Sequence, residues 1–373
     1  MPRITWIGLG SIGEAICTNL AHHAALERPL LLWNRTREKA ERLAAATQMM
    51  NVAYSLEEAV SKADIVCLCL ADDAAVASVV EAAALASVSG KLFVDLSTVH
   101  PDTNQAQADR FQSLGAMYIA CPIFGGVAMA IERQITLVLA GPSDAIARFE
   151  PFTKGVICKD VIKLADQPLR EAGMLKLVGN FVRFSAIEVL CEASVLSEKI
   201  GLPKETLAKF VGALIPGPSA GQLAMLHAGA YSDLTTNIAP ISMALKENGY
   251  LNDLAKQNGV RLRTLDTVTA HAERVNEMRG PDAKLLAIYG SIREENGLSF
   301  DNHKLEPLID RPGKLSQSQT LTQSPTSVLG AHGRALNEPG RIVAPEFRFG
   351  ATVGQRASRR QARSGGSGPT PQG

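Results

Sequence analysis

A glycine-rich segment near the start of the chain has the spacing of a phosphate-binding turn. Gly8–Gly13 fits the pattern G-x-G-x-x-G, follows an apolar strand-like run and opens a stretch with helical spacing. Gly8 permits the tight turn, Gly10 lets the backbone approach a pyrophosphate, and Gly13 lets the helix pack closely on the strand. The segment therefore predicts a dinucleotide site, with a ligand-free glycine turn as the alternative. Its candidate residues are Gly8, Gly10, Ser11, Ile12 and Gly13.

Residues about twenty positions further on indicate which dinucleotide fits. An NAD enzyme usually carries an Asp or Glu there for the ribose hydroxyls. This chain has Asn34-Arg35-Thr36 instead. Arg35 could pair with a 2′-phosphate, and Asn34 and Thr36 could add neutral hydrogen bonds. We therefore expect NADP(H) rather than NAD(H), with a solvated loop charge as the alternative role of Arg35.

A lysine and an asparagine four residues apart could carry acid–base chemistry. Residues 169–199 contain no Pro and two Gly, which predicts one long helix. Lys176 and Asn180 then share one face, and Gly173 leaves room there for a bound molecule. Lys176 could give a proton to a carbonyl oxygen, with a pKa lowered by burial, while Asn180 holds the substrate or the lysine in register. Spacing alone favours an ordinary exposed helix face.

Other candidates follow two further apolar runs. Ser97 and Thr98 come after one of them, at the kind of strand end where ligands bind in open α/β sheets, although they could equally cap a helix. We add Leu70 and Ala71, at the end of the other run, to the cofactor-binding candidates. His100 is a weaker acid–base candidate, because its position before a proline fits a loop.

The elements that must position these residues are visible in the apolar pattern. Over residues 3–140, six short apolar runs alternate with helix-like stretches, which predicts parallel strands buried on both faces and an α/β fold with a Rossmann-type doubly wound sheet. After about residue 165 the pattern predicts an all-helical domain, with helices over 169–199, 204–213, 218–229, 236–257 and 282–295. The predicted domains are a cofactor domain over 1–164, a helical substrate and dimerisation domain over 165–303, and a disordered tail over 304–373 whose composition cannot build a core.

Composition excludes several classes of protein. The chain of 373 residues has 38 Lys and Arg against 37 Asp and Glu, which argues against a charge-driven nucleic-acid binder. Its apolar runs are too short for a membrane span. The six cysteines include no CxxC pair, so we expect no metal site. The first residues enter a strand-like run directly, so we expect no signal peptide and a cytoplasmic location.

Several motifs together resemble the β-hydroxyacid dehydrogenase family, which includes 3-hydroxyisobutyrate dehydrogenases and, more distantly, 6-phosphogluconate dehydrogenases and imine reductases. The resemblance covers roughly residues 3–303. After the glycine turn and Asn34-Arg35-Thr36, its motifs are Val94-Asp95-Leu96-Ser97-Thr98, Cys121-Pro122-Ile123-Phe124-Gly125-Gly126, Gly173–Asn180 and Leu245-Lys246-Glu247. It implies that Lys176 and Asn180 are catalytic, that Lys246 reaches the cofactor or substrate, and that the protein forms intimate homodimers.

One departure from the family bears on the substrate. Phe124 stands where a Ser usually precedes the two glycines, which suggests a bulkier or less polar small molecule on Phe124, Gly125, Gly126 and Lys176. Gly125 and Gly126 would present backbone N–H groups to it. The leading hypothesis is an NADP-dependent oxidoreductase acting on a hydroxyl or carbonyl group. An imine reductase and a non-catalytic NADP-binding protein are the alternatives.

Overall fold

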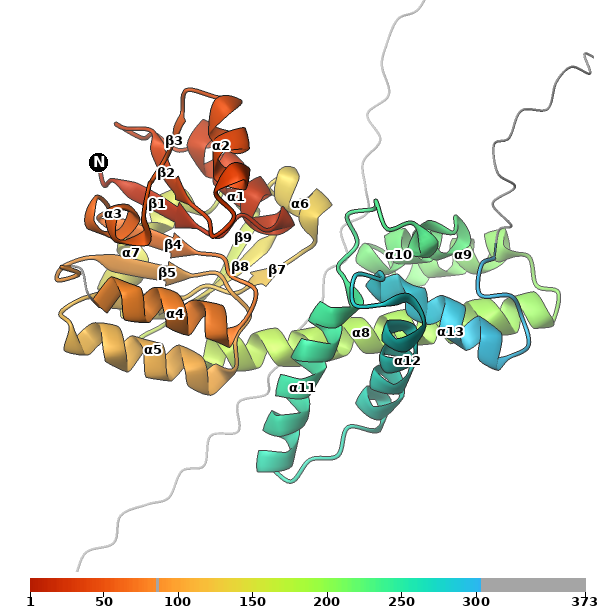
Figure 1. Ribbon diagram of the computed structural model, residues 1–373. Helices are drawn as coiled ribbons and strands as arrows, with labels where there is room; N and C mark the ends of the chain where they lie inside the picture. The colour runs from red at the N-terminus through yellow and green to blue at the C-terminus, as the bar shows by residue number, and fades with distance from the viewer. Residues whose placement is uncertain (85–86, 303–373) are drawn as a thin grey trace, which may run out of the picture. The chain divides into compact units, whose positions relative to one another are not determined.

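The computed structural model describes residues 1–84 and 87–302, and in this part of the chain nine strands form one sheet (Figure 1). The strand order is β3-β2-β1-β4-β5-β6-β8-β7, with β9 paired to β8. Strands β1 to β6 are parallel, whereas β8 runs antiparallel to β6 and β7. The strands are β1 (Ile4–Ile7), β2 (Leu30–Trp33), β3 (Met50–Val52), β4 (Ile65–Leu68), β5 (Leu92–Asp95), β6 (Met117–Ala120), β7 (Ile123–Phe124), β8 (Thr136–Gly141) and β9 (Asp160–Ala165).

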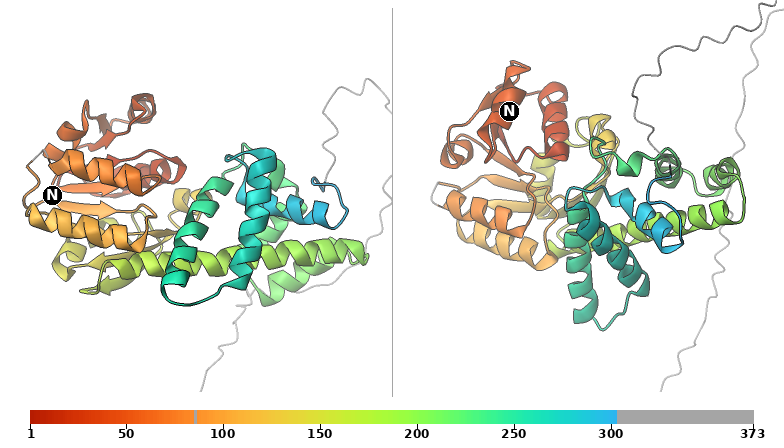
Figure 2. Two further views of the ribbon diagram at one scale, coloured as in Figure 1. Left: turned by 60° about the horizontal axis from the view of Figure 1, so that its bottom comes forward. Right: turned by 45° about the vertical axis from the view of Figure 1, so that its right-hand side comes forward.

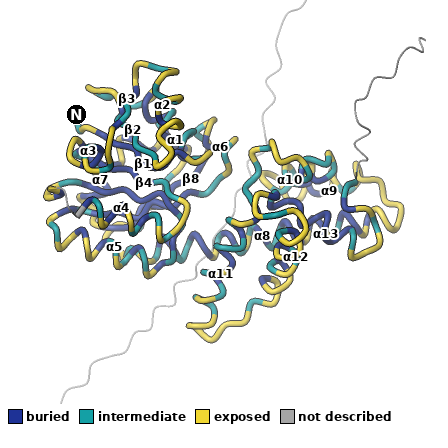
Figure 3. The backbone as a smooth tube through the Cα atoms, in the orientation of Figure 1, coloured by how far each residue is buried: buried dark blue, intermediate teal, exposed yellow. Residues whose placement is uncertain are grey.

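The central strands are buried on both faces because helices cover both sides (Figure 3). Along β1, Trp6 packs into the core beneath α1 and α7, while Ile7 packs into the core beneath α3, α4 and α5. Cys67 and Leu68 of β4 divide in the same way. These helices are α1 (Ser11–His23), α2 (Arg37–Ala45), α3 (Leu56–Ser61), α4 (Asp73–Ala84), α5 (Pro101–Ser113), α6 (Val127–Ile131) and α7 (Ser143–Phe149).

The order 3-2-1-4-5-6 is that of a dinucleotide-binding Rossmann sheet. Successive strands are added on one side of β1 up to β3 and on its other side from β4 onward. The connections therefore diverge between β1 and β4, and this divergence opens a crevice at the carboxyl ends of these parallel strands. The glycine turn follows β1, Asn34-Arg35-Thr36 follows β2, and Leu70 and Ser97 follow β4 and β5. The fold therefore brings the predicted cofactor residues to one edge of the sheet.

The second half of the described chain is helical. Helix α8 (Arg170–Lys199) is its longest element, and α11 and α12 form a hairpin that packs against it (Figure 2). A separate apolar core includes Phe184 and Cys191 of α8, Val268 of α12 and Ile288 of α13. The other helices are α9 (Lys204–Leu214), α10 (Pro218–His227), α11 (Ile241–Gln257), α12 (Arg263–Arg279) and α13 (Ile288–Glu295), with three short 3₁₀ turns at Glu150–Phe152, Ala230–Ser232 and Leu285–Ala287.

The α/β fold class and the helical second half are confirmed, with four differences in detail. The sheet is mixed rather than wholly parallel, because β8 returns antiparallel beside β6. Strands β3, β7 and β9 and helix α12 were not predicted. Helix α11 begins at Ile241 rather than at residue 236, because Pro240 has no backbone N–H to donate to a helical hydrogen bond. The predicted helix over 282–295 is a 3₁₀ turn followed by α13. The predicted tail over 304–373 lies outside the described residues, and the proposed division into domains of function stays a prediction.

Candidate functional site

The three glycines of the first turn have different surroundings. Gly8 has φ +101°, and a Cβ on it would lie 2.3 Å from the Cys69 carbonyl oxygen. A Cβ on Gly13 would lie 2.5 Å from the Gly8 oxygen, so both positions require glycine for the fold. A Cβ on Gly10 would meet nothing within 4 Å. The bare face of Gly10, at the N-terminus of α1 beside Ser11, is therefore open to a ligand, as a pyrophosphate requires.

Asn34 supports the turn through hydrogen bonds of its side chain. Its Oδ1 accepts from the Leu9 backbone N–H at 2.8 Å, and its Nδ2 donates to the Thr36 carbonyl oxygen at 2.8 Å. Arg35 is exposed and makes no side-chain hydrogen bond or ion pair with the described residues. Asn34 thus fixes the strand end, and the Arg35 guanidinium stays available to an anion.

A pocket of about 280 Å³ lies at this strand end. Arg37 closes one side, with its guanidinium 4.7 Å from the centre of the Tyr54 ring. Among the described residues that line the pocket there is no Asp or Glu. Arg37 and Tyr54 were missed in the sequence, although Tyr54 follows the short strand β3 at the same sheet edge. The lining residues are Trp33, Asn34, Arg35, Arg37, Ala40, Val52, Ala53, Tyr54, Ser55 and Leu56.

The ends of β4 and β5 are joined by buried polar groups. Ser97 accepts the Leu70 N–H on its hydroxyl at 2.9 Å and donates its own N–H to Asp95 Oδ1 at 2.9 Å. The other Asp95 oxygen accepts from the Tyr118 hydroxyl at 2.7 Å. Burial raises the pKa of the Asp95 carboxyl. Ser97, predicted as a cofactor contact, therefore holds two strand ends in register.

Lys246 links α11 to the same strand ends. Its Nζ donates to the Ala71 carbonyl oxygen at 2.7 Å and to the Thr98 carbonyl oxygen at 2.8 Å. One turn later the Tyr250 hydroxyl donates to the Asp73 carboxylate at the start of α4. The structure thus brings together the candidates Lys246, Ala71 and Thr98, through hydrogen bonds that hold the helical half on the sheet edge. His100, the weaker acid–base candidate, caps α5 by accepting the Asp102 N–H at 3.2 Å.

The predicted catalytic pair is buried and hydrogen-bonded. Lys176 is 7% exposed and Asn180 2% exposed. Lys176 Nζ donates to the Ile123 carbonyl oxygen at 2.9 Å and to Asn180 Oδ1 at 3.3 Å. Burial lowers the pKa of Lys176 to about 8, against an opposing effect of Glu247. A buried lysine that titrates near neutral pH is suited to move a proton.

Two further charged residues complete the cluster and were missed as site residues. Asn180 Nδ2 donates to the carboxylate of Glu247, which is 3% exposed, and Arg183 Nη1 donates to Asn180 Oδ1 at 3.2 Å. Arg183 lies seven residues after Lys176, a spacing that places both on one helix face and was readable in the sequence. Glu247 comes from α11, 67 residues beyond Asn180 along the chain, so its contact with Asn180 could not be predicted from spacing in the sequence.

Strand β7 and the two glycines that follow it form the next part of the site, and β7 lies against the lysine. The Phe124 ring packs on Gly179 of α8, where a Cβ would lie 2.6 Å from its Cε1, and the ring centre is 5.1 Å from Lys176 Nζ. Gly125 has φ +139°, and a Cβ on it would lie 2.6 Å from Ile135. A Cβ on Gly126 would meet nothing within 4 Å. Gly125 therefore serves the backbone, and Gly126 has an open face.

The described residues contain neither a group of three or more His, Cys, Asp and Glu able to hold a metal ion nor a helix long and apolar enough to cross a membrane. A sheet of this strand order, with a glycine turn that leaves Gly10 open, is typical of dinucleotide-binding proteins, and comparison with known proteins agrees with this class.

Residues 3–157 match the family model of the NAD binding domain of 6-phosphogluconate dehydrogenase. The chain is 35% identical over 296 residues to the NADH-dependent oxidoreductase ucdB of Aspergillus ustus, which covers 78% of this chain and 98% of that protein. The chain therefore belongs to the 6-phosphogluconate dehydrogenase NAD-binding family, among its β-hydroxyacid dehydrogenase-like members, and is an NAD(P)-dependent oxidoreductase.

Solved structures show the same fold. One is that of Psf3 in complex with NADP+ and 2-OPP, with a TM-score of 0.68 at 22% identity, covering 78% of this chain and 99% of that one. Another is 3-hydroxyisobutyrate dehydrogenase of Mycobacterium tuberculosis with L-serine, with a TM-score of 0.66 at 20% identity, covering 79% and 99%.

Proposed function

We propose that this protein is an NADP-dependent oxidoreductase that interconverts a carbonyl and a hydroxyl group of a small molecule, with Lys176 as the general acid or base. The observation that carries the proposal is the buried amine of Lys176, held by the Ile123 carbonyl oxygen and by Asn180 Oδ1. Its pKa of about 8 means that both protonation states are populated near neutral pH.

The hydrogen bonds of Lys176 explain how it would act. An ammonium group has three N–H donors, and two of them are used within the protein. The third can donate to a carbonyl oxygen of the substrate and release its proton there during reduction. In the oxidative direction the neutral amine takes the hydroxyl proton. Asn180 fixes the amine in place, because its own amide is held by Glu247.

The surroundings of Lys176 support this role. The Phe124 ring and the Ile123 carbonyl cover the amine from the sheet side, so bulk water has little access to it. Desolvation of this kind favours the neutral amine and brings its pKa toward the working pH. Gly126, two residues after the Phe124 ring, has an open face that offers a place for the substrate.

The cofactor half of the proposal depends on the crevice of the sheet. When bound, the nicotinamide cofactor supplies or accepts the hydride. Gly10 and the first amides of α1 would hold its pyrophosphate, since nothing occupies the space over Gly10. Arg35, exposed beside a pocket without a lining carboxylate, would pair with a 2′-phosphate. This supports NADP(H), whereas the relative ucdB is named for NADH, so the two cofactors must be compared directly.

The test of the activity is a substrate panel. The purified full chain is mixed with NADPH or NADH and with aldehydes, β-ketoacids and cyclic imines. Faster turnover of carbonyl compounds with NADPH is expected. Turnover confined to imines would favour the imine reductase alternative, for which Lys176 is not needed as a proton donor because a protonated imine already carries its proton.

We also propose that the protein is a homodimer. Four apolar residues on one face of α8 are exposed, at spacings of four and seven residues: Val178, Val182, Val189 and Leu196. A stripe of this kind is suited to bury itself against a second copy. Light scattering at micromolar concentration should give the mass of a dimer, and Val182→Glu should shift it toward the monomer. A monomeric parent protein would contradict the proposal.

A further inference from the structure

Helix α11 reaches three other parts of the fold with side chains from two of its turns. Lys246 donates to the carbonyl oxygens that follow β4 and β5, at 2.7 and 2.8 Å. Glu247 accepts from Asn180 of α8, and the Tyr250 hydroxyl donates to the Asp73 carboxylate of α4. Tyr250 lies four residues after Lys246 and three after Glu247, so these side chains are neighbours on the helix. Helix α11 therefore connects the sheet edge with the buried cluster on α8.

The carboxylate of Asp73 is the point where α4, α5 and α11 meet. It lies in the first turn of α4, where a negative charge is favoured. One of its oxygens accepts from the His100 backbone N–H at 3.0 Å and from the Thr103 hydroxyl of α5, and the other accepts from the Tyr250 hydroxyl. Burial by itself would raise the pKa of Asp73, but these hydrogen bonds outweigh burial and lower the pKa. Asp73 is therefore a charged acceptor, which makes its hydrogen bonds strong.

The Tyr250 side chain is held through its ring as well as its hydroxyl. The Lys246 ammonium lies 5.5 Å from the centre of the ring, and the His100 ring meets it edge-on at a centroid distance of 5.8 Å. Burial, and then the bond to Asp73, raises the pKa of Tyr250, so its hydroxyl keeps its proton near neutral pH. The contact with Asp73 is therefore present at any pH where a lysine of pKa about 8 transfers a proton.

The same turn of α11 holds the proton-transferring group through two further hydrogen bonds. Glu247, three residues before Tyr250, is 3% exposed and accepts from Asn180 Nδ2. Asn180 Oδ1 in turn accepts from Lys176 Nζ at 3.3 Å. A shift of this turn would move Glu247 and hence the groups that depend on it.

We propose that Tyr250 is a positioning residue for the proton transfer. Its hydroxyl on Asp73 fixes α11 where Glu247 meets Asn180. Because Asn180 holds the Lys176 amine, a fixed α11 keeps that amine in register with the substrate. Reaction rates are sensitive to such placement, since a displacement of about 1 Å can cost about 100-fold. The inference rests on the proposed function and adds to it a residue that acts only through other side chains.

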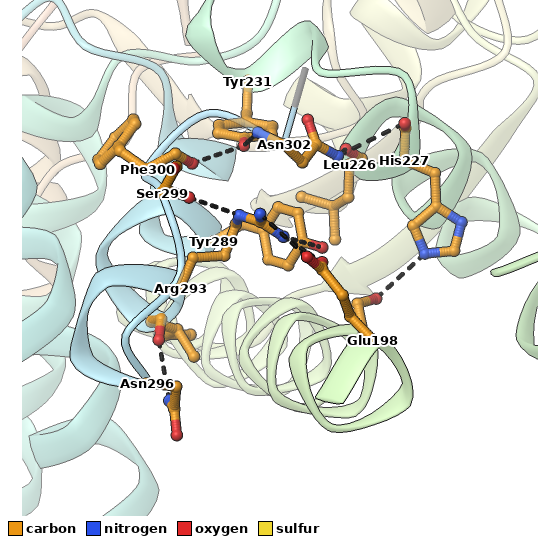
Figure 4. Close-up of polar contacts among 12 residues, drawn as sticks. Glu198, Leu226, His227, Tyr231, Tyr289, Arg293, Asn296, Ser299, Phe300 and Asn302 are labelled. Carbon is orange, nitrogen blue, oxygen red and sulfur yellow. Dashed lines mark hydrogen bonds and ion pairs between the residues drawn. The ribbon is translucent and has the colours of Figure 1, made fainter. Parts of the chain in front are cut away.

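A second tyrosine provides a matched control for a purely structural hydroxyl. Tyr231 is 1% exposed, donates to the Phe300 carbonyl oxygen at 2.7 Å and accepts the Asn302 N–H at 2.8 Å (Figure 4). Both partners lie at the end of the described chain, and neither belongs to the cluster on α8. Tyr231→Phe thus removes one bonded hydroxyl from the helical half, as Tyr250→Phe does, without touching the path to the lysine.

The experiment measures reduction, with NADPH, of the aldehyde that the parent protein reduces fastest. Tyr250→Phe should lower kcat by roughly 5- to 50-fold, since it displaces the proton donor without removing it. KM should stay within about threefold, because the groups that contact the substrate are retained. Tyr231→Phe should lower the melting temperature but keep kcat within about twofold of the parent. Parent-like kcat in Tyr250→Phe, or an equal loss of kcat in Tyr231→Phe, would overturn the inference.

A double-mutant cycle tests the path from Tyr250 to the lysine. In the Asn180→Ala protein the path is already broken, so the further change Tyr250→Phe should lower kcat by less than about twofold. Losses that add in full would show that Tyr250 does not act through Asn180, and would also overturn the inference.

A measurement without turnover separates this inference from the proposed function, which fails if the parent reduces no carbonyl compound. Acetic anhydride labels lysine amines, and mass spectrometry of the peptides gives the rate at each site. The buried Lys176 should be labelled slowly in the parent, with the exposed Lys199 as internal reference. In Tyr250→Phe the labelling of Lys176 should be at least about threefold faster, because the cluster opens locally more often. In Tyr231→Phe it should match the parent. Equal labelling of Lys176 in the parent and in Tyr250→Phe would refute the inference.

Discussion

The two halves of the candidate site differ in whether main chain or side chains are left to contact a ligand. At the sheet edge, polar side chains such as Asn34 and Ser97 bond to the protein's own backbone, and the surface left for a ligand is main chain over Gly10. On α8 and α11, buried side chains bond to one another and leave basic groups incompletely paired. The sheet edge is therefore suited to hold a cofactor by shape, and the helical cluster to act on a substrate by charge. Single side-chain changes should matter most in the helical cluster.

Replacement of the buried lysine is the strongest test of this contrast. Lys176→Ala should lower the rate on a carbonyl substrate by roughly 100- to 10,000-fold, the range for a positioned acid–base group. NADPH affinity should change little, because the cofactor site lies at the sheet edge. Lys176→Arg should not rescue, since guanidinium stays protonated. Lys199→Ala, on the exposed end of the same helix, is the control.

Neighbouring changes sharpen this test. Asn180→Ala should cost less than Lys176→Ala, and the two losses should not add, because the residues act as one unit. On an imine substrate the Lys176→Ala loss should be small. Near-parent turnover by Lys176→Ala on the best carbonyl substrate would refute the mechanism.

The pH profile reports the state of the same amine. Because its pKa is lowered to about 8, the ammonium form that donates the proton disappears above that pH. The rate of carbonyl reduction should fall about tenfold per pH unit above about 8. Alcohol oxidation, which needs the neutral amine, should rise up to about 8 and then level off. A rate that does not change with pH in the parent protein would argue against Lys176 as the proton donor. In Lys176→Ala, which lacks this amine, the rate should not change with pH in this range.

At the sheet edge a single charge should matter for one cofactor only. Arg35→Ala should weaken NADPH binding by about tenfold, the lower end for a charge-assisted contact at an exposed site. NADH binding should stay within about twofold, because NADH lacks the 2′-phosphate. Dissociation constants from fluorescence titration give both numbers, with Arg110→Ala on α5 as the control. Equal affinity of the parent for both cofactors would show that Arg35 does not select between them.

The end of the described chain should contribute to stability, whereas the tail should not. Phe300 is 6% exposed, and Asn302 donates its N–H to the Tyr231 hydroxyl at 2.8 Å and its Nδ2 to the Leu226 carbonyl oxygen at 2.8 Å (Figure 4). A chain ending at residue 297 should melt about 5–15 °C lower than the parent, from the loss of a buried aromatic side chain and these bonds. A chain ending at residue 303 should keep both melting temperature and activity, as the tail composition predicts. Aggregation of the chain that ends at residue 303 would show that residues 304–373 are needed for stability.

The smallest expected effect concerns a histidine away from the site. His271 of α12 lies 2.6 Å from Glu188 of α8 and 2.9 Å from Glu295 of α13, and these carboxylates raise its pKa to about 9. The pKa of a histidine in the unfolded chain is about 6.5. The stabilisation that the charged His271 gives the fold is therefore complete below pH 6.5 and is lost as the pH rises through about 9. Urea unfolding should show His271→Gln less stable by about 1–2 kcal/mol at pH 6, discounted for the exposure of Glu295. The two proteins should converge above pH 9, and a constant difference across this range would contradict the account.

The sequence alone was enough for features that depend on local spacing. The strand before Gly8, the position of the glycine turn and the long helix through Lys176 follow from patterns a few residues apart, because burial on a strand or helix repeats at short intervals. The same local logic could have found more. Arg183 lies on the face of Lys176, and α12 shows buried Leu265, Val268, Ala272 and Val275 at helical spacing.

Only the tertiary structure decided how distant segments share the site. Glu247 reaches Asn180, Lys246 binds the strand ends 148 and 175 residues away, and the Phe124 ring rests on Gly179. Strand β3 has three residues, and β9 has no fully buried residue but a mixture of exposed and half-buried ones, so neither carries a buried apolar run that marks it in the sequence. A local pattern records which face of an element is apolar, whereas the partner of that face is set by packing of the whole chain. The sequence therefore specified the lysine and the glycine turn, and the fold alone placed Lys176 in a buried cluster where its pKa falls toward 8.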